Sequence, residues 1–316
     1  MNILVSCAGG PAAVGVIKSM RDFDSHGDHK IVAIDCDELS VGFHLADKSY
    51  VVPFSVEDNY WKEVLKVIHK EDIDLIVPTG DADIVHFSRN ETMLKKMGVV
   101  NFMSDYKTII NCQDKLSFYE TAKRKGLVHL MPETSNDWKE IEFPILCKPR
   151  RGSGSRGIEL WENENQIKDF SLTENLHYSS DYIYQEYLPG QEYTIDVLCD
   201  LDGNVLANIP RERLQTKAGI SSKGRIVRSK LIEDNCAQLC KAFNIKGPVC
   251  IQMKEDCNGD MKFVEVNPRM GGGTYFTTLA GVNFMKLIIG IIGGGDVKVP
   301  TPKEITVLSY YNEVVV

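Results

Sequence analysis

Residues 262–269 of this chain read Lys-Phe-Val-Glu-Val-Asn-Pro-Arg and carry the most information about its fold. A second apolar run, residues 250–254, precedes them, and Asn258-Gly259 lies between the two. Asn-Gly between two strand-like runs is a strong short-range signal for a β-hairpin. The sequence therefore predicts two paired antiparallel strands, with Asn-Pro-Arg at the end of the second one.

The second strand of this hairpin carries polar side chains at alternate positions. Glu265, Asn267 and Arg269 are expected to share one face, because alternate residues of a strand face the same side. Gln252 lies on the neighbouring strand. One carboxylate and two amide oxygens suit Mg²⁺, which takes few protein ligands and completes its shell with phosphate and water. Arg269 can face the same phosphates. A solvated hairpin rim is the plainer alternative.

A basic, glycine-rich segment lies upstream at residues 148–157, with the sequence Lys-Pro-Arg-Arg-Gly-Ser-Gly-Ser-Arg-Gly. The backbone N–H groups of such a segment can surround a phosphate, and Lys148 adds a positive charge at the end of the preceding strand. The GxxxxGK[ST] order of a P-loop is absent, since the lysine here precedes the glycines. A plain basic turn has the same composition, so this segment alone is not decisive.

Residues 184–192, Tyr-Gln-Glu-Tyr-Leu-Pro-Gly-Gln-Glu, follow a predicted strand and break at Pro-Gly. A strand edge that ends in this way can offer backbone donors and acceptors to an adenine ring, and Glu192 can accept hydrogen bonds from ribose hydroxyls. An ordinary β-turn would have the same appearance. The order of these segments is more informative than any one of them.

In that order, from the lysine and glycine segment to Glu-x-Asn-Pro-Arg, the chain resembles the ATP-grasp superfamily. The resemblance covers nearly the whole chain and is greatest to the branch of carbamoyl-phosphate-synthase-like enzymes and carboxylate–amine ligases. It implies an α/β chain with an ATP-grasp fold, preceded by a small open parallel-sheet lobe (the pre-ATP-grasp lobe). It also implies ATP and Mg²⁺, or Mn²⁺, as cofactors.

The same resemblance implies roles for particular residues. The residues that correspond to nucleotide-binding positions are Lys115, Lys148, Ser153, Gly154, Ser155, Gly157, Glu186, Tyr187, Leu188 and Glu192. The residues that correspond to metal ligands are Gln252, Glu265 and Asn267. Arg269 is expected to stabilise the transferring phosphoryl group.

Residues 210–219, Pro-Arg-Glu-Arg-Leu-Gln-Thr-Lys-Ala-Gly, are expected from the same resemblance to form a loop beside the acyl phosphate. Arg213 and Lys217 are the candidate substrate-binding cations of this loop. A solvated run of charges would look the same in the sequence, so this alternative stays open.

The amino-terminal part alternates predicted strands, at residues 2–7, 30–35 and 74–78, with helices. Buried strands separated by helices indicate a parallel sheet. Gly9-Gly10 together with Asp35 could suggest a dinucleotide site, but the glycine spacing is GGxxxxG rather than GxGxxG. We expect this glycine loop, at the start of a helix, to bind substrate rather than NAD.

The change from a parallel to an antiparallel pattern divides the chain in two. Residues 1–110 are assigned to the pre-ATP-grasp lobe and residues 111–316 to the ATP-grasp domain. The latter is expected to contain a small lid lobe at about residues 115–190 and a larger antiparallel-sheet lobe at about residues 191–316. Residues 305–316 are expected to form a final strand.

The composition is that of an ordinary globular protein, with 43% hydrophobic and 25% charged residues. No run approaches the roughly 20 apolar residues needed to cross a bilayer, and the N-terminus lacks the basic region of a signal peptide. The net charge of −8 argues against a general nucleic-acid binder. Nine cysteines without a CxxC pair are typical of reduced thiols, which predicts a cytoplasmic protein.

The predicted activity is ATP-dependent ligation. A carboxylate attacks the γ-phosphorus of ATP, and the acyl phosphate then passes its acyl group to an amine, which gives ADP and phosphate. Three alternatives stay open. They are phosphorylation of bicarbonate or carbamate as in carbamoyl phosphate synthase, a nucleotide-binding regulatory protein without turnover, and an NAD-dependent oxidoreductase.

The expected partners are a small carboxylate and an amine, without nucleic acid or membrane. Many free-standing ligases of this kind continue for some tens of residues beyond the helix that follows Asn-Pro-Arg, whereas this sequence ends soon after it. A homodimer or a partner subunit is therefore expected to complete the acceptor side.

Overall fold

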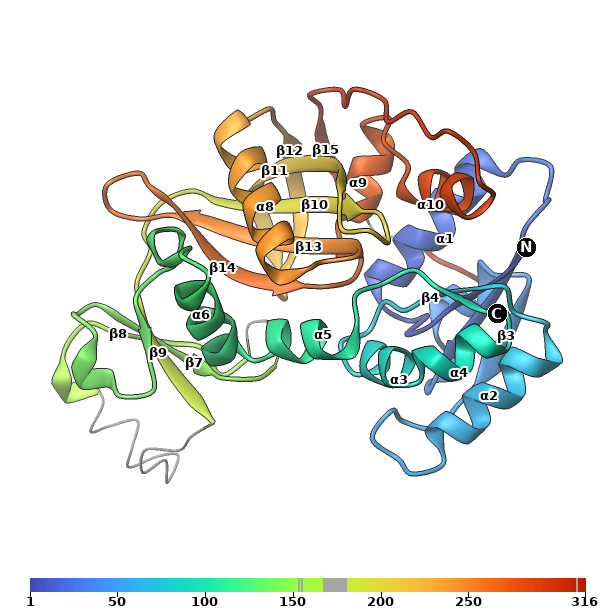
Figure 1. The fold of residues 1–316 in the computed structure, drawn as a ribbon, viewed down its shortest axis with the longest axis horizontal. Helices are drawn as coiled ribbons and strands as arrows, with labels where there is room; N and C mark the ends of the chain where they lie inside the picture. Colours follow the sequence, from blue (N-terminus) through green and yellow to red (C-terminus); the bar gives the residue numbers. More distant parts are fainter. Residues whose placement is uncertain (153, 155, 167–180, 311) are drawn as a thin grey trace.

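The computed structural model describes residues 1–152, 154, 156–166, 181–310 and 312–316 (Figure 1). Within these residues the chain forms a five-stranded, a four-stranded and a six-stranded sheet. The four-stranded sheet lies at one end of the long axis and the five-stranded sheet at the other, with the six-stranded sheet between them (Figure 1). No helix in the described part of the chain is long and apolar enough to cross a membrane.

The five-stranded sheet is entirely parallel, as predicted for the amino-terminal part, and has the strand order β3-β2-β1-β4-β5. Its strands are β1 (Asn2–Val5), β2 (Lys30–Asp35), β3 (Lys48–Val51), β4 (Leu75–Val77) and β5 (Val100–Asn101). The helices around it are α1 (Pro11–Phe23), η1 (Val41–His44), α2 (Tyr60–Lys70), α3 (Asp83–Arg89), α4 (Glu91–Lys96) and α5 (Tyr106–Gln113). This is the open α/β arrangement whose ligands bind at the carboxyl ends of the strands.

The two faces of the parallel sheet are covered by different helices. Because neighbouring residues of a strand face opposite sides, Ile3 and Val5 belong to a core that includes α1 and the carboxy-terminal helices. Leu4 and Ile34 belong to a second core, formed with α2, α3 and α4. The first core also contains residues of the six-stranded sheet, so it joins the amino-terminal part to the rest of the molecule.

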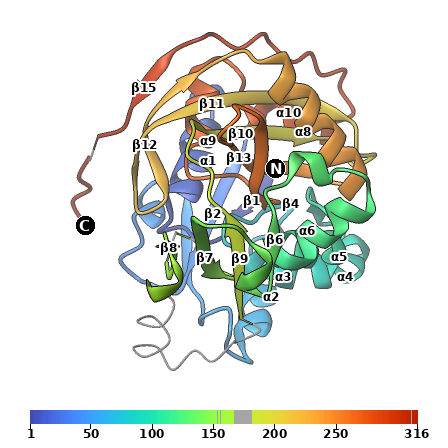
Figure 2. The same cartoon turned by 90° about the vertical axis from the view of Figure 1, so that its left-hand side faces the viewer.

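The four-stranded sheet follows α6 (Lys115–Arg124) and has the strand order β6-β9-β7-β8. Its strands are β6 (Thr134–Ser135), β7 (Ile145–Pro149), β8 (Glu159–Trp161) and β9 (Tyr182–Glu186), with the short helices η2 (Val128–Leu130) and η3 (Trp138–Glu140) nearby. All of its described pairings are antiparallel. Figure 2 looks onto this end of the molecule and shows β7, β8 and β9 below the strands of the six-stranded sheet.

The six-stranded sheet is antiparallel and has the order β14-β13-β10-β11-β12-β15. Its strands are β10 (Glu192–Cys199), β11 (Val205–Lys217), β12 (Ile220–Ile226), β13 (Gly247–Glu255), β14 (Met261–Asn267) and β15 (Thr306–Leu308). Helix α8 (Lys230–Phe243) packs on one face, and α9 (Thr274–Leu279) and α10 (Phe284–Ile292) contribute to the core on the other. The predicted α/β fold with an open parallel lobe is confirmed.

Two local expectations were wrong. Residues 210–219 do not form a loop, because β11 continues to Lys217 and the chain returns into β12 through a two-residue turn at Ala218 and Gly219. Both turn residues have positive φ, 48° and 75°, as a tight hairpin turn requires. Alanine is rare at such a position, so no residue pattern in this segment indicates a hairpin. The final strand is confined to β15, Thr306–Leu308, rather than residues 305–316.

Candidate active site

Two adjoining cavities lie where the three sheets meet. The outer cavity, of about 510 Å³, lies between the four-stranded and six-stranded sheets and is lined by Lys148 and Lys254 among others. The inner cavity, of about 390 Å³, reaches the amino-terminal part of the chain at Pro11 and Thr79. Arg213 is among the residues that line both. The two cavities are therefore parts of one site.

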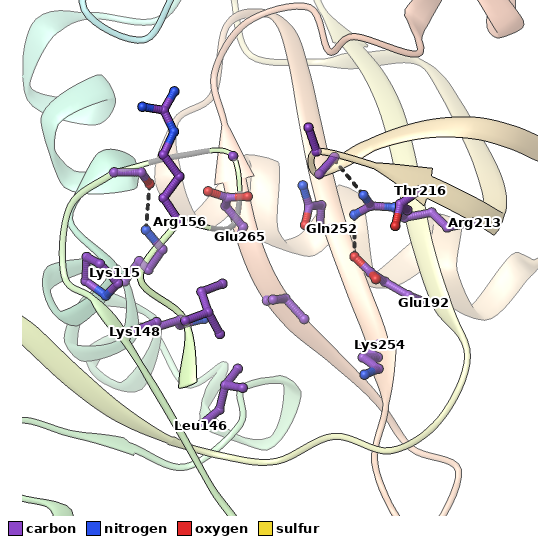
Figure 3. Close-up of a pocket in the computed structure, with 17 residues that line it drawn as sticks. Lys115, Leu146, Lys148, Arg156, Glu192, Arg213, Thr216, Gln252, Lys254 and Glu265 are labelled. Carbon is purple, nitrogen blue, oxygen red and sulfur yellow. Dashed lines mark hydrogen bonds and ion pairs between the residues drawn. The ribbon is translucent and has the colours of Figure 1, made fainter. Parts of the chain in front are cut away.

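The predicted metal ligands lie at the boundary between the cavities. Gln252 and Glu265 are cross-strand partners in the pairing of β13 with β14, and Asn267 is two residues further along β14. Gln252 and Glu265 line both cavities, and Asn267 lines the inner one. Figure 3 shows Glu265 between the lysines of one wall and Gln252 of the other.

This donor set fits a hard divalent cation that phosphate helps to hold. It supplies one carboxylate and two amide oxygens, and Mg²⁺ typically binds through one or two carboxylates plus phosphate oxygens and water. The described residues contain no cluster of three or more histidine, cysteine or acidic side chains of the kind that holds a metal without such help.

Arg269 follows the end of β14 and connects it to the amino-terminal part of the chain. Its Nε and Nη2 atoms donate to the two carboxylate oxygens of Asp81, at 2.5 and 2.9 Å, and Nη1 donates to the backbone oxygen of Met270. Arg269 also lines the inner cavity. The bidentate contact fixes the plane of the guanidinium group beside the predicted metal ligands.

Lys148 is a buried cation in the wall of the outer cavity. It lies near the end of β7 and is only 3% exposed, and its Nζ atom donates to Oε1 of Gln185 at 2.7 Å. Burial, together with the positive charge of Lys115, lowers the pKa of Lys148 to about 7, although Glu265 and Glu192 oppose this shift. An anion in the outer cavity would stabilise the charged form of Lys148 and so raise its pKa.

Lys115 lies at the start of α6, on the same side of the outer cavity as Lys148 (Figure 3). Its Nζ atom donates to the backbone oxygen of Gly152 at 2.9 Å. The contact joins α6 to the glycine-rich segment.

The glycine-rich segment borders both cavities. Gly154 and Arg156 line the outer and the inner cavity. Gly154 and Gly157 have φ values of 74° and 68°, a conformation that favours glycine. The candidate residues Ser153 and Ser155 lie outside the described residues.

The predicted adenine-binding residues begin at Glu186, the last residue of β9. The backbone N–H of Glu186 donates to Glu133, and that of Tyr187 donates to Pro144, so both groups already have partners. Leu188 is buried. Glu186, Tyr187 and Leu188 are not among the described residues that line the outer cavity. The Tyr187 ring does contact Lys254, which lines it.

Glu192 and Arg213 form an ion pair with each other across neighbouring strands, β10 and β11. Both line the outer cavity, and Arg213 also donates to the backbone oxygen of Gly219 at 2.7 Å (Figure 3). Lys217, the second predicted cation of this segment, lies at the end of β11 and is not among the described residues lining either cavity.

Sequence reasoning missed a buried ion pair under the inner cavity. Arg211 donates from Nη1 to Oδ2 of Asp196 at 2.7 Å, and both side chains are 1% exposed. Thr277 donates to the same carboxylate oxygen at 2.6 Å. Arg211 also lines the inner cavity. A signal was available, because Arg211 and Arg213 fall on one face once residues 210–219 are read as a strand.

Asp35 is the residue that could suggest a dinucleotide site. Both of its carboxylate oxygens accept backbone hydrogen bonds from nearby loops. One carboxylate oxygen accepts a hydrogen bond from the backbone N–H of Gly9 at 2.8 Å, and the other accepts one from Asp37 at 3.0 Å. The carboxylate thus stabilises the glycine loop after β1. This use of both oxygens weakens the case for a ribose contact there.

Comparison with known families matches both parts of the chain. Residues 179–314 match a family described as ATP-grasp in the biosynthetic pathway with Ter operon. Residues 4–102 match the PylC-like N-terminal domain. The carboxy-terminal part of the chain is thus similar to an ATP-grasp family and the amino-terminal part to the PylC-like N-terminal domain, which confirms the predicted resemblance.

The chain is also similar to large chains of carbamoyl phosphate synthase. It is 26% identical over 288 residues to that of Clostridium beijerinckii, covering 85% of this chain and 26% of the relative. It is 24% identical over 281 residues to the arginine-specific large chain of Bacillus subtilis, covering 82% and 26%. The chain thus spans about a quarter of the length of these relatives.

Solved structures share the fold at lower identity. The biotin carboxylase domain dimer of the Hydrogenobacter thermophilus 2-oxoglutarate carboxylase, in complex with MgADP, ADP and bicarbonate, has a TM-score of 0.73 at 21% identity. The match covers 94% of this chain and 70% of that one. The N5-carboxyaminoimidazole synthetase of Staphylococcus aureus, complexed with ADP, also has a TM-score of 0.73, at 17% identity, covering 94% and 78%.

Proposed function

We propose that this chain is an ADP-forming, ATP-dependent ligase that phosphorylates a carboxylate and transfers the acyl group to an amine. The observation that carries the proposal is the meeting of the two cavities at the paired Gln252 and Glu265. This arrangement offers a place for Mg-ATP in the outer cavity and for the acid in the inner cavity, with the predicted metal ligands between them.

The nucleotide phosphates are proposed to lie in the outer cavity against Lys148, Lys115 and Arg156. Lys148 is buried and donates to the amide oxygen of Gln185, and no carboxylate among the described residues is in hydrogen-bonding contact with it, so a phosphate would stabilise its charged form. Gln252, Glu265 and Asn267 would hold Mg²⁺, or Mn²⁺, which takes the same oxygen ligands. When bound, the ion would neutralise charge on the phosphoryl oxygens.

The acid is proposed to lie in the inner cavity. Its carboxylate oxygen attacks the γ-phosphorus, the bond between that phosphorus and the bridging oxygen breaks, and ADP leaves. The amine then attacks the acyl carbon, its proton is lost, and phosphate leaves. Arg213 and Arg269 line this cavity, and their positive charges would stabilise the charge that develops on the transferring phosphoryl group. The protein needs no side-chain nucleophile for either step.

The lining of the inner cavity favours a small acid. The segment after Arg269 contributes three successive glycines, Gly271–Gly273, and α1 contributes Pro11 and Ala12. No aromatic side chain is among the described residues that line it. A cavity of about 390 Å³ with walls of this kind suits a compact, non-aromatic substrate.

Phosphorylation of bicarbonate or carbamate is the second candidate function. It is favoured by the similarity to carbamoyl phosphate synthase large chains and by the neighbour that contains bicarbonate. A regulatory role without turnover is less favoured, because the site contains a complete set of candidate metal ligands beside Arg269.

The proposed setting of the enzyme is the cytoplasm, since all nine cysteines are unpaired. A homodimer or a partner subunit is proposed to complete the acceptor side, with a dimer supported by the dimeric biotin carboxylase domain. The division of the chain near residues 110 and 190 also stays a proposal.

The test is ADP formation from Mg-ATP by the purified chain across a panel of small carboxylic acids and bicarbonate, each with and without amine acceptors. The proposal predicts ADP release that requires one class of acid and is completed by an amine. Absence of acid-dependent ADP formation with every acid, in a folded protein that binds Mg-ATP, would contradict it. Release that requires bicarbonate alone would favour the second candidate.

A further inference from the structure

The side chain that faces Lys148 is a buried amide rather than a carboxylate. Nζ of Lys148 donates to Oε1 of Gln185 at 2.7 Å, and Nε2 of Gln185 donates to Oγ1 of Thr134 at 2.8 Å. The three residues are 3%, 5% and 6% exposed. They lie on β7, β9 and β6, which are successive neighbours in the four-stranded sheet. The sheet therefore holds all three in one buried row.

The hydrogen bond that Thr134 makes determines which atom donates and which accepts in the rest of this row. The hydroxyl of Thr134 donates to the backbone oxygen of Pro132 at 3.0 Å, so its single proton is already used. Its oxygen can then only accept from Gln185, which places the NH₂ group of that amide toward Thr134. The amide oxygen must consequently face Lys148, where it can accept from the ammonium group.

Because the Gln185 amide is neutral, it accepts a hydrogen bond from Lys148 without cancelling the charge of the lysine. A carboxylate would neutralise the lysine, whereas an amide orients the ammonium group and leaves its charge for another ligand. We propose that Gln185 is a positioning residue that directs the Lys148 ammonium to the nucleotide phosphates and, with Thr134, keeps its charge available to them. The inference rests on the proposed binding of nucleotide in the outer cavity.

The charged groups around Lys148 are arranged so that its protonation responds to the nucleotide. Lys115 on α6 disfavours the charged form, while Glu192 on β10 and Glu265 on β14 favour it. Burial is the largest influence and, with these charges, lowers the pKa to about 7. Arg156 also lines the cavity and adds a further positive charge. Nucleotide affinity in the natural chain is therefore expected to fall as pH rises through this range.

Two substitutions at Gln185 should move this pH dependence in opposite directions. Gln185→Glu places a negative charge beside the lysine, which raises its pKa and moves the midpoint of the affinity profile to higher pH. Gln185→Met removes the acceptor, which moves the midpoint to lower pH. At pH 7 we expect Gln185→Glu to bind Mg-ATP about tenfold more weakly, because its carboxylate competes with phosphate for the lysine.

A milder pair of variants tests the orientation of the amide. Thr134→Val removes the hydroxyl that fixes the amide, and we expect weaker Mg-ATP binding, whereas Thr134→Ser keeps the hydroxyl and should bind as the natural chain does. Gln238→Glu, an exposed position on α8, controls for the added charge. Thermal unfolding of each variant shows whether it folds.

The measurement is the dissociation constant of Mg-ATP by calorimetry between pH 6 and 9. Opposite midpoint shifts for Gln185→Glu and Gln185→Met, with an unchanged Gln238→Glu, support the proposal. Shifts in the same direction, or none in folded variants, would overturn it, as would equal binding by the two Thr134 variants. Failure of the natural chain to bind Mg-ATP would instead contradict the proposed function itself.

Discussion

Glu265 is the single carboxylate among the candidate metal ligands, and its position between the two cavities gives it the largest expected effect on turnover. We predict that Glu265→Gln reduces ADP formation by at least about a hundredfold. The lost negative charge weakens binding of the metal ion that would neutralise the phosphoryl oxygens. The fold should be retained, since the substitution preserves shape. Steady-state ADP formation measures the effect.

The control for this variant is Glu120→Gln, an exposed position on α6, which should leave turnover unchanged. A folded Glu265→Gln protein that turns over as fast as the unsubstituted chain would show that Glu265 is not a metal ligand. If the variant binds Mg-ATP as tightly as the unsubstituted chain but no longer turns over, the role of Glu265 is still supported, because the effect then falls on the chemical step.

Lys148 should also leave a signature in the pH dependence of stability. Its pKa is lowered to about 7 in the folded chain, against an ordinary value of 10.5. Between these two pH values the unfolded chain binds one proton more than the folded chain, so the free energy of unfolding rises with pH there. The slope from this group is at most about 1.4 kcal/mol per pH unit.

Lys148→Met removes this contribution, so the difference in stability between the natural chain and the variant should grow in favour of the natural chain from pH 7 to pH 9. Urea unfolding at several pH values gives the difference. A difference that does not change over this range would mean that the lysine is not held with a lowered pKa.

At the scale of elements, the segment Gly271–Gly273 forms part of the inner cavity because it carries no side chains. A Cβ atom on Gly272 would lie 3.1 Å from the Ile220 side chain and 3.3 Å from that of Pro11. Gly272 does not have a positive φ, so the backbone tolerates alanine. The added methyl group would fill space that we assign to the acid.

We therefore predict that Gly272→Ala raises the KM for the acid about tenfold while the KM for ATP changes less than twofold. The ATP value within the same variant is the internal control, since Gly272 is not among the described residues that line the outer cavity. Equal increases in both values would indicate a general distortion of the site. An unchanged KM for the acid would place the acid elsewhere.

The elements also show what the sequence could and could not reveal. The hairpin of β13 and β14 was predictable because Asn258-Gly259 marks the turn and polar residues alternate along the second strand. The β11–β12 hairpin was not, because its turn contains Ala218 and its strand carries successive charged residues. The boundary of β15 was missed because strand ends depend on pairing with β12 rather than on local composition.

The candidate site was predictable to the extent that its residues follow strand periodicity. Alternation predicts that Glu265 and Asn267 share a face, but Glu265 lies opposite Gln252 only because the register shifts by one residue between Gln252 and Met253, which no local pattern predicts. The contact of Asp81 with Arg269 joins residues 188 positions apart, and no local pattern specifies such a pair. The same is true of Gln185 beside Lys148, because only the strand order of the sheet makes them neighbours.

At the scale of the whole molecule, the ion pair of Asp81 with Arg269 links the parallel sheet to the end of β14. The side chains are 28% and 14% exposed, so solvent screens the pair only in part. We predict that Asp81→Asn lowers the free energy of unfolding by about 1–2 kcal/mol and slows turnover, because Arg269 loses its bidentate partner.

Chemical denaturation and steady-state kinetics on one preparation test this prediction. Asp37→Asn, at an exposed position in the loop after β2, is the matched control and should change turnover little. Unchanged turnover in a folded Asp81→Asn protein would show that the orientation of Arg269 does not depend on this contact.

In the proposed complex, the terminal phosphates of ATP lie between Lys148 and the Gln252 and Glu265 pair, so attack falls on the γ-phosphorus. The most direct test identifies the products when the chain turns over with its acid and hydroxylamine in place of the amine. We predict ADP and phosphate, with one hydroxamate formed for each ADP. Stoichiometric AMP and pyrophosphate would contradict the proposed acyl-phosphate mechanism, because they require attack at the α-phosphorus.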